Sequence, residues 1–316
     1  MRILLALDGS ESSIHARDLV AGLPWPEGTA ICAASVYELP IDWTGAVGAS
    51  MPWVGDAEGA MRDELSAELE RLTDSLAGRG WQLERRVVKG RPATAILDVA
   101  RNFEADLIVL GSRGRGPLTS MLLGSVSAEV VDQAGCSVLV ARGSEASRLL
   151  VATDGSDAAR AIPDILSGWG AFSGAAVETI SVAPLPERSF ELLAEVYTLG
   201  NYRPDDDRQD LLDRHVGLAE DMAQQLAERG MVATATVLAG DAAHEIIAAA
   251  RRRGEHMIVT GTRGLHGVER FILGSVARNV LLHAPCSVLV VRSRSRALGD
   301  MAERAKSAAR IATPTV

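Results

Sequence analysis

The chain has 316 residues, of which 47% are hydrophobic and 23% are charged, and its formal net charge is −9. This balance is typical of a folded, soluble protein, and the length suits two domains better than one. Because nucleic acids and anionic lipid surfaces are themselves negatively charged, the acidic balance argues against both as partners.

Cysteine usage and the start of the chain indicate a compartment. Three widely spaced cysteines, Cys32, Cys136 and Cys286, have neither the density of a disulfide framework nor the spacing of a zinc site. The apolar run at the N-terminus ends at Asp8, which is too short for a signal peptide, and no run reaches the roughly 18 apolar residues of a membrane span. We therefore expect reduced thiols, a cytoplasmic location and no membrane span.

Short apolar strands alternate with longer amphipathic stretches along the first half of the chain. The predicted strands cover residues 2–7, 29–36, 82–88, 107–110 and 137–140, and the predicted helices cover residues 12–22, 57–77, 92–102 and 122–133. This alternation predicts parallel strands with right-handed crossovers and helices on both faces of the sheet. The expected fold class is α/β, with an open, mostly parallel, doubly wound sheet.

The chain is one unit written twice. The segment ILLALDGS at residues 3–10 reappears as LLVATDGS at residues 149–156, and 16 of the 34 positions from 109 to 142 are identical to those from 259 to 292. A period of this length matches a whole domain, so the sequence predicts a tandem duplication. We expect two five-stranded domains, residues 1–143 and 148–293, related by a pseudo-twofold axis. Residues 294–316 have no counterpart and are expected to form a frayed helix or a mobile tail.

Each half carries a glycine-rich segment after its fourth strand. The segments are GSRGRGPLTSMLLGS at residues 111–125 and GTRGLHGVERFILGS at residues 261–275. Glycine lets the backbone approach a ligand closely, successive N–H groups can hold an anion, and the GS pair opens a helix whose first amides are free. The alternative is that these glycines only end a strand, but two intact copies favour binding. The patterns of the P-loop and of the GxGxxG dinucleotide site are absent.

An aspartate ends the first strand of each half. Asp8 and Asp154 are each followed by Gly and Ser, which also form an ordinary strand-to-helix turn with a serine cap. In the functional interpretation, each carboxylate accepts hydrogen bonds from a ribose or an adenine amino group at the end of the sheet. The two aspartates are also the candidates for contact with a magnesium ion that accompanies a bound chain of phosphates, and no metal ligand is assigned.

The combination of these motifs resembles the universal stress protein family in its tandem, ATP-binding form. The resemblance rests on GxxG, nine further residues and GS, on DGS after the first strand and on SV closing the second strand, and it covers residues 2–292. It implies one ATP site in each half, with the aspartate at the adenosine, the valine against adenine, and the glycines and serine at the ribose and phosphates. The implied cofactor-binding residues are Ala6, Leu7, Asp8, Val36, Gly111, Arg113, Gly114, Arg115, Gly124, Ser125 and Val126 in the first half, and Ala152, Thr153, Asp154, Val182, Gly261, Arg263, Gly264, Gly274, Ser275 and Val276 in the second.

Two classes of function compete. The first is an ATP-binding regulatory protein of the stress response, which changes conformation or partners with nucleotide and hydrolyses it slowly at most. The alternative is an adenylate-handling enzyme, that is, a slow ATPase or a nucleotidyl or phosphoryl transferase on a related fold. Efficient phosphoryl transfer needs a positioned base and several charges at the transferred group, and the sequence offers no such set, so no catalytic residue is predicted. His244 begins a zincin-like segment, but Ala248 stands where the second histidine belongs.

The last strand of each half is apolar. An exposed edge of this kind would be left unpaired if the half stood alone. Single-domain members of the family pair such edges to form dimers, so the chain resembles a fused dimer. We expect residues 137–141 to lie antiparallel to residues 287–291, with the two nucleotide sites facing outward. Whether whole chains also form homodimers is left open by the sequence.

Overall fold

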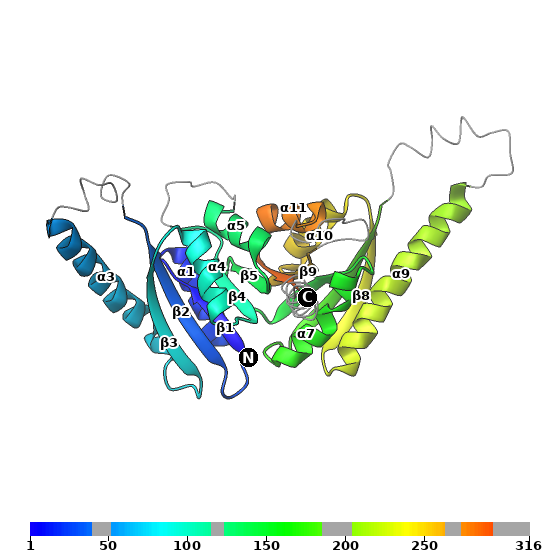
Figure 1. The fold of residues 1–316 in the computed structure, drawn as a ribbon. Helices are drawn as coiled ribbons and strands as arrows, with labels where there is room; N and C mark the ends of the chain where they lie inside the picture. The colour runs from blue at the N-terminus through cyan, green and yellow to red at the C-terminus, as the bar shows by residue number, and fades with distance from the viewer. Residues whose placement is uncertain (40–51, 115–122, 185–203, 263–272, 293–316) are drawn as a thin grey trace, which may run out of the picture.

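The computed structural model describes residues 1–39, 52–114, 123–184, 204–262 and 273–292. Within these residues ten strands form one sheet in the order β3-β2-β1-β4-β5-β10-β9-β6-β7-β8, with helices on both faces (Figure 1). The expected α/β fold is confirmed, and each half contributes five strands. The tail, residues 294–316, lies outside the described residues.

The two halves contain corresponding elements. The first half contains β1 (Arg2–Ala6), α1 (Glu11–Gly22), β2 (Ala30–Tyr37), α3 (Pro52–Thr73), the 3-10 turn η2 (Asp74–Leu76), β3 (Gln82–Lys89), α4 (Pro92–Asn102), β4 (Leu107–Gly111), α5 (Ser125–Gln133) and β5 (Ser137–Ala141). The second half contains β6 (Arg148–Ala152), α6 (Asp157–Arg160), α7 (Ile162–Trp169), β7 (Ala176–Ala183), α9 (Pro204–Glu228), β8 (Val232–Ala239), α10 (Ala242–Arg253), β9 (Met257–Gly261), α11 (Ser275–His283) and β10 (Ser287–Val291).

Two helices differ from their predicted bounds by more than one residue. The helix expected from residue 122 begins at Ser125, because Gly124 has an extended backbone and forms the N-cap. The helix expected over residues 57–77 begins at Pro52, a residue that suits the first turn of a helix. It becomes a 3-10 turn after Thr73, whose hydroxyl donates to the carbonyl of Leu69 at 2.8 Å. Hydrophobic periodicity does not encode these local backbone interactions.

The strands within each half are parallel, and their winding reverses at one point. β1 lies between β2 and β4, and β6 lies between β7 and β9. In the first half, the chain therefore adds strands on one side of β1 and then on the other side. In the second half, it does the same around β6. In open parallel sheets, ligands bind beyond the carboxyl ends of the strands at such a reversal. This topology places one candidate crevice at β1 and β4, and a second at β6 and β9.

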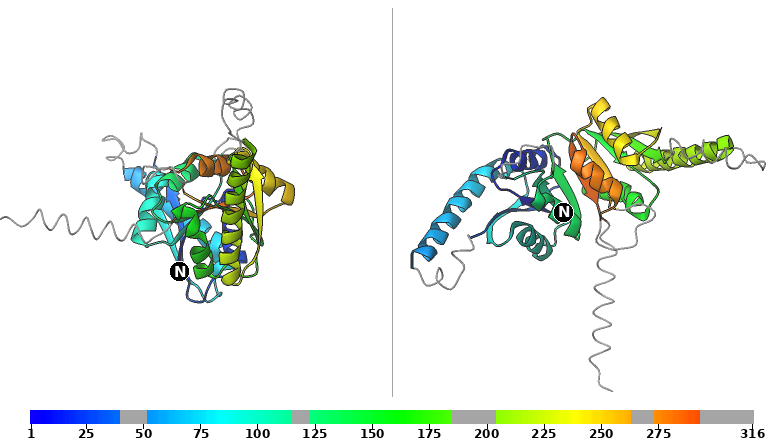
Figure 2. Two further views of the ribbon diagram at one scale, coloured as in Figure 1. Left: turned by 90° about the vertical axis from the view of Figure 1, so that its right-hand side faces the viewer. Right: turned by 90° about the horizontal axis from the view of Figure 1, so that it is seen from above.

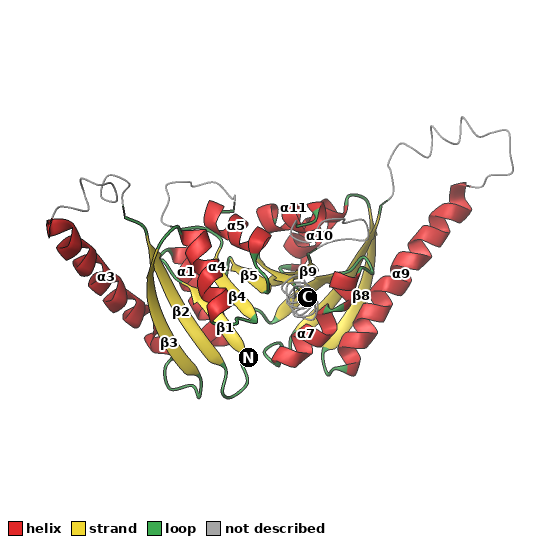
Figure 3. Cartoon of the chain, viewed as in Figure 1, coloured by secondary structure: helices red, strands yellow, loops and turns green. Residues whose placement is uncertain are grey.

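Helices cover the sheet in two layers (Figures 2 and 3). One layer consists of α4, α5, α10 and α11, and it packs on alternate strand residues such as Leu4, Ile108 and Val288. The other consists of α1, α3, α7 and α9, and it packs on the residues between them, such as Leu5, Val109 and Leu289. Strands covered on both faces consist almost entirely of apolar residues, as LIVLG in β4 does.

The two halves join through their last strands. β5 and β10 are antiparallel, with Val138 opposite Val290, Leu139 opposite Leu289 and Val140 opposite Val288. The predicted pairing of residues 137–141 with residues 287–291 is therefore confirmed. Leu139 and Leu289 are equivalent residues of the repeat, so the pseudo-twofold axis passes between them.

Two arginines connect the halves reciprocally beside this strand pair. The Arg142 guanidinium donates to the carbonyl of Leu281 in α11, and the Arg292 guanidinium donates to the carbonyl of Val131 in α5. Each cation thus lies at the C-terminal turn of the opposing helix, where the helix dipole favours positive charge. Burial lowers the pKa of Arg142. Helices α5 and α11, which receive these contacts, lie side by side over the join in Figure 1.

Candidate functional site

The first crevice begins with a fixed turn after β1. Gly9 has a φ of 75°, which favours glycine, and Ser10 caps α1 by accepting a hydrogen bond from the Ser13 amide at 3.3 Å. Asp8 holds this turn with one oxygen, because Oδ1 accepts from the Ser10 amide at 3.0 Å and from the Ser10 hydroxyl at 2.6 Å. Asp8 therefore does hold the strand-to-helix turn, and both of these hydrogen bonds end on Oδ1.

The other carboxylate oxygen of Asp8 faces the glycine loop. A Cβ atom built on Gly114 would lie 2.8 Å from Asp8 Oδ2, so only glycine fits there without moving the carboxylate. The loop is held to α1 by Ser12, whose hydroxyl donates to the Arg113 carbonyl and accepts from the Arg113 amide at 3.1 Å. Asp8, Arg113 and Gly114 therefore lie close together at one side of the crevice.

Gly111 has a packing role that the sequence interpretation understated. A Cβ atom on Gly111 would lie 2.6 Å from the Ser12 carbonyl carbon and 2.7 Å from the Ser13 amide nitrogen. Because these are backbone atoms of α1, they cannot move aside as a flexible side chain could. Glycine is thus required at the end of β4 by helix packing, whether or not a ligand is present.

The far side of the crevice is the start of α5. Gly124 is its N-cap and forms no side-chain cap bond, while its amide donates to the Ser112 carbonyl at 2.8 Å. The Ser127 hydroxyl, one turn further, donates to the Gly111 carbonyl at 2.8 Å and fixes the helix to β4. The first amides of α5, at Ser125 and Val126, therefore begin a helix without a side-chain cap, which is an arrangement that suits an anion.

The second crevice repeats this design. Asp154 Oδ1 accepts from the Ser156 amide at 3.0 Å, and Gly155 has a φ of 73°. A Cβ on Gly261 would lie 2.9 Å from Ala158 Cβ and 3.0 Å from the Ala158 carbonyl carbon. Helix α11 begins at Ser275 after an N-cap glycine, Gly274, again without a side-chain cap.

Helix α9 gives the second crevice a cover that sequence analysis missed. His215 Nδ1 lies 2.7 Å from the Ser181 hydroxyl, which donates to the Thr153 carbonyl at 2.9 Å. The Leu218 side chain lies over Gly155, with Cδ2 2.5 Å from where a Cβ atom would be. Burial, followed by the charge of Arg214, lowers the pKa of His215, and the Asp154 carboxylate opposes this effect. The one sequence signal for this cover is the spacing of His215 and Leu218, which are three residues apart and so lie on one face of a helix.

The remaining predicted residues differ in burial and in their place at the strand and helix ends. The side chains of Leu7 and Val182 are buried, each in one of the two helix layers. The Thr153 hydroxyl is used locally, because it accepts from the Gly155 amide at 3.3 Å. Ala6, Val36 and Ala152 lie at the carboxyl ends of their strands, and Val276 follows Ser275 in the first turn of α11. Three predicted residues lie outside the described residues: Arg115, Arg263 and Gly264.

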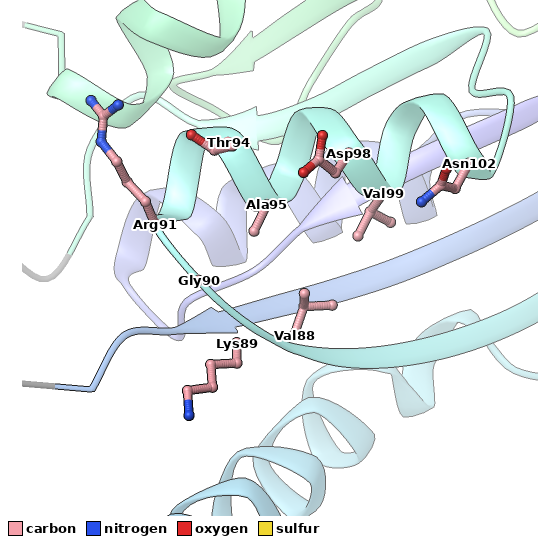
Figure 4. A pocket seen from close by; sticks show the side chains of 9 residues that line it. All are labelled: Val88, Lys89, Gly90, Arg91, Thr94, Ala95, Asp98, Val99 and Asn102. Atoms are coloured by element: carbon pink, nitrogen blue, oxygen red, sulfur yellow. The ribbon is translucent and has the colours of Figure 1, made fainter. Parts of the chain in front are cut away.

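A separate cavity of about 240 Å³ lies between β3 and α4 (Figure 4). Val88, Ala95 and Val99 form its apolar part, and Thr94, Asp98 and Asn102 follow one another along α4. None of the predicted nucleotide residues lines it. In the second half, the Glu245 side chain lies against Gly240, where Ala95 lies against Gly90 in the first half. The repeated feature is therefore the crevice, not this cavity.

The described part of the chain contains no cluster of three or more His, Cys, Asp or Glu side chains arranged to hold a metal ion. Among the described residues discussed above, Asp8 is the aspartate of the first crevice and Asp154 that of the second. Among the helices of those same residues, none combines the length and the apolarity needed to cross a membrane.

Comparison with known proteins agrees with the tandem repeat. The model of the universal stress protein family matches residues 1–142 and again residues 145–292. The chain belongs to the universal stress protein family. A universal stress protein of Thermus aquaticus is 34% identical over 145 residues, which cover 44% of this chain and 97% of that protein. One from Mycobacterium tuberculosis is 26% identical over 230 residues, covering 68% of this chain and 71% of that protein.

A solved structure supports the fold of this tandem universal stress protein over both halves. The crystal structure of a universal stress protein from Archaeoglobus fulgidus superposes with a TM-score of 0.62 and 21% sequence identity. The match covers 93% of this chain and 97% of that one. At this identity the likeness concerns the fold, and the function must be argued from the site.

Proposed function

We propose that each half of this universal stress protein binds one ATP molecule, and that the chain acts as a nucleotide-dependent regulator of the stress response with slow hydrolysis at most. The observation that carries the proposal is the position of Asp8 Oδ2, which lies beside Gly114 while Oδ1 holds the turn. A structural turn needs only one of these oxygens. The other supplies an acceptor for a ribose hydroxyl or an adenine amino group.

The phosphates would lie between the glycine loop and the start of α5. The amides of Ser125 and Val126, in the first turn after an N-cap glycine, and the exposed side chain of Arg113 provide donors and positive charge beside the crevice. The second half offers the same arrangement at Ser275 and Val276. A chain of phosphates suits this site because the backbone amides of a helix donate hydrogen bonds to phosphate oxygens at any pH.

A magnesium ion carried by ATP would fit the same donor set. Such an ion takes most of its ligands from phosphate oxygens and water, and usually one or two from protein carboxylates. Asp8 in the first crevice and Asp154 in the second each offer one carboxylate oxygen that the turn does not use. Bound magnesium would neutralise part of the triphosphate charge, while the protein would position the nucleotide.

The proposal is tested by calorimetric titration of the purified chain with ATP, and by chromatography of small molecules released when the protein is denatured. We expect ATP binding and a released adenine nucleotide. Gly114→Ala should weaken binding in the first site about tenfold or more, because its methyl group displaces the Asp8 carboxylate. Gly135→Ala is the matched control, since its Cβ would meet no atom within 4 Å. Absence of binding at millimolar ATP would refute the proposal.

Hydrolysis is tested separately from binding. In single-turnover conditions, with enzyme in excess over radiolabelled ATP, we expect the bound nucleotide to persist far longer than in an efficient phosphoryl transferase, which turns over in about a second or less. A fast burst of ADP would favour the alternative, an adenylate-handling enzyme. Loss of that burst in Asp8→Asn would then identify the responsible half.

A further inference from the structure

The two outer edges of the sheet differ in charge. β3 and β8 are its terminal strands, each has eight residues, and their alternating patterns of exposure are the same. β3 carries four charged residues, Glu84, Arg85, Arg86 and Lys89. β8 has the sequence VATATVLA, without any charge and with two β-branched threonines at its centre.

The register identifies the backbone groups on the outer edge of β8. The Gly240 amide donates to Ala183 of the neighbouring strand at 3.0 Å, and the Thr234 carbonyl accepts from the Thr179 hydroxyl of that strand at 3.1 Å. Even-numbered residues therefore direct their backbone groups toward β7. Because this direction alternates along a strand, Ala233, Ala235 and Val237 direct theirs outward. Within the described residues no strand pairs with this outer side.

Proteins usually protect a free sheet edge with charged side chains, bulges or proline, because unpaired backbone groups attract another strand. β3 has such charges, and β8 does not. Val232, at the start of β8, is 71% exposed, which is high for a large apolar side chain. We propose that β8 pairs antiparallel with β8 of a second copy of this chain, which joins the two sheets across a twofold axis.

The sequence of β8 is complementary to itself in one register. With Ala235 opposite Ala235, the outward-facing Ala233 pairs with Val237, Thr234 lies opposite Thr236, and the exposed Val232 lies opposite Leu238. Threonine pairs and aliphatic pairs both stabilise antiparallel strands, and no like charges meet. The same pairing at β3 would place Arg85 opposite Arg85. A β3-to-β8 contact would be heterologous and open-ended, whereas the β8 pair closes as a dimer.

Ala235 provides the sharpest test, because it is exposed and would meet itself on the axis. Ala235→Lys and Ala235→Glu each place like charges opposite one another, so each full-length variant alone should dissociate into monomers, with dimer affinity about tenfold or more weaker. A mixture of the two variants should restore the dimer through opposite charges. Gln82→Lys, at an exposed position on β3, is the matched control and should leave association unchanged.

Sedimentation velocity of the full chain measures the outcome. The wild type should sediment at twice the chain mass of 33.4 kDa, each single variant at one chain mass, and the mixture again at twice that mass. Thermal unfolding followed by circular dichroism shows that the variants are folded. A monomeric wild type, or a dimer that Ala235→Lys leaves intact, would overturn the proposal. So would folded variants whose mixture remains monomeric.

Discussion

The first and second crevices share their turns and glycines but differ in the helix above them. Over Asp154, α9 places His215 against Ser181 and Leu218 over Gly155. Under the alignment that pairs Gly90 with Gly240, the α3 residues at those positions are Leu65 and Glu68. Gly155 and Ser156 are buried, whereas Gly9 and Ser10 are partly exposed. The two halves therefore share a binding framework at the strand ends, and the covering helix makes their sites unequal.

The join between the halves shows the opposite behaviour. Arg142 and Arg292 are equivalent residues, and they reach equivalent carbonyls, those of Leu281 and Val131. The ion pair between Arg278 and Asp132, at 3.0 Å, breaks the symmetry, because the equivalent positions hold Ala128 and Leu282. We therefore expect equivalent substitutions in the two halves to lower the free energy of unfolding equally at the join and unequally at the crevices.

The largest expected effect is at the ends of β4 and β9. Gly111→Ala should lower the free energy of unfolding by about 3 kcal/mol, because its methyl group would meet α1 backbone atoms at 2.6 and 2.7 Å. Gly261→Ala should cost about 1 kcal/mol, since its nearest contacts are 2.9 to 3.1 Å. Urea denaturation followed by circular dichroism measures both. Equal losses would show that the two helix starts pack alike.

Substitutions of the two joining arginines should have equal effects, each smaller than that of Gly111→Ala. Arg142→Met and Arg292→Met each remove charged hydrogen bonds to buried carbonyls at a helix C-terminus, at a cost of about 2 kcal/mol. We expect the two values to agree within about 0.5 kcal/mol, the usual error of additivity. The same denaturation experiment measures them. A large difference would mean that the pseudo-twofold symmetry does not extend to the energetics of the join.

The smallest expected effect is a pH dependence confined to the second half. Burial lowers the pKa of His215 below its ordinary value of 6.5, so the unfolded chain binds the proton more tightly than the folded one. Stability contributed by this group is therefore full above about pH 6.5 and is lost as the pH falls below it. His215→Leu, which copies Leu65 of the first half, should flatten this part of the profile. Melting temperatures between about pH 5 and pH 7.5 measure it, and an unchanged slope would contradict the assignment.

Sequence alone predicted the fold because periodicity and repetition are strong signals. It also predicted the pairing of β5 with β10, since two apolar last strands need partners. It did not predict that Gly111 packs against the backbone of α1, because contact between β4 and the first turn of α1 is a tertiary property. It missed His215 for a related reason, since the helix position that faces Ser181 depends on how α9 lies on the sheet. Residues at strand ends were predictable, whereas the cover over them was not.

The central claim, one ATP site in each half, is tested most directly by the number of ATP molecules bound per chain. Calorimetric titration should give two for the wild type, and one each for Asp8→Ala and Asp154→Ala, because each variant removes the carboxylate of one crevice. The double variant should bind none, and Asp98→Ala, which removes an exposed carboxylate on α4, should still bind two. A wild-type value below two, or two sites remaining in either aspartate variant, would contradict the account.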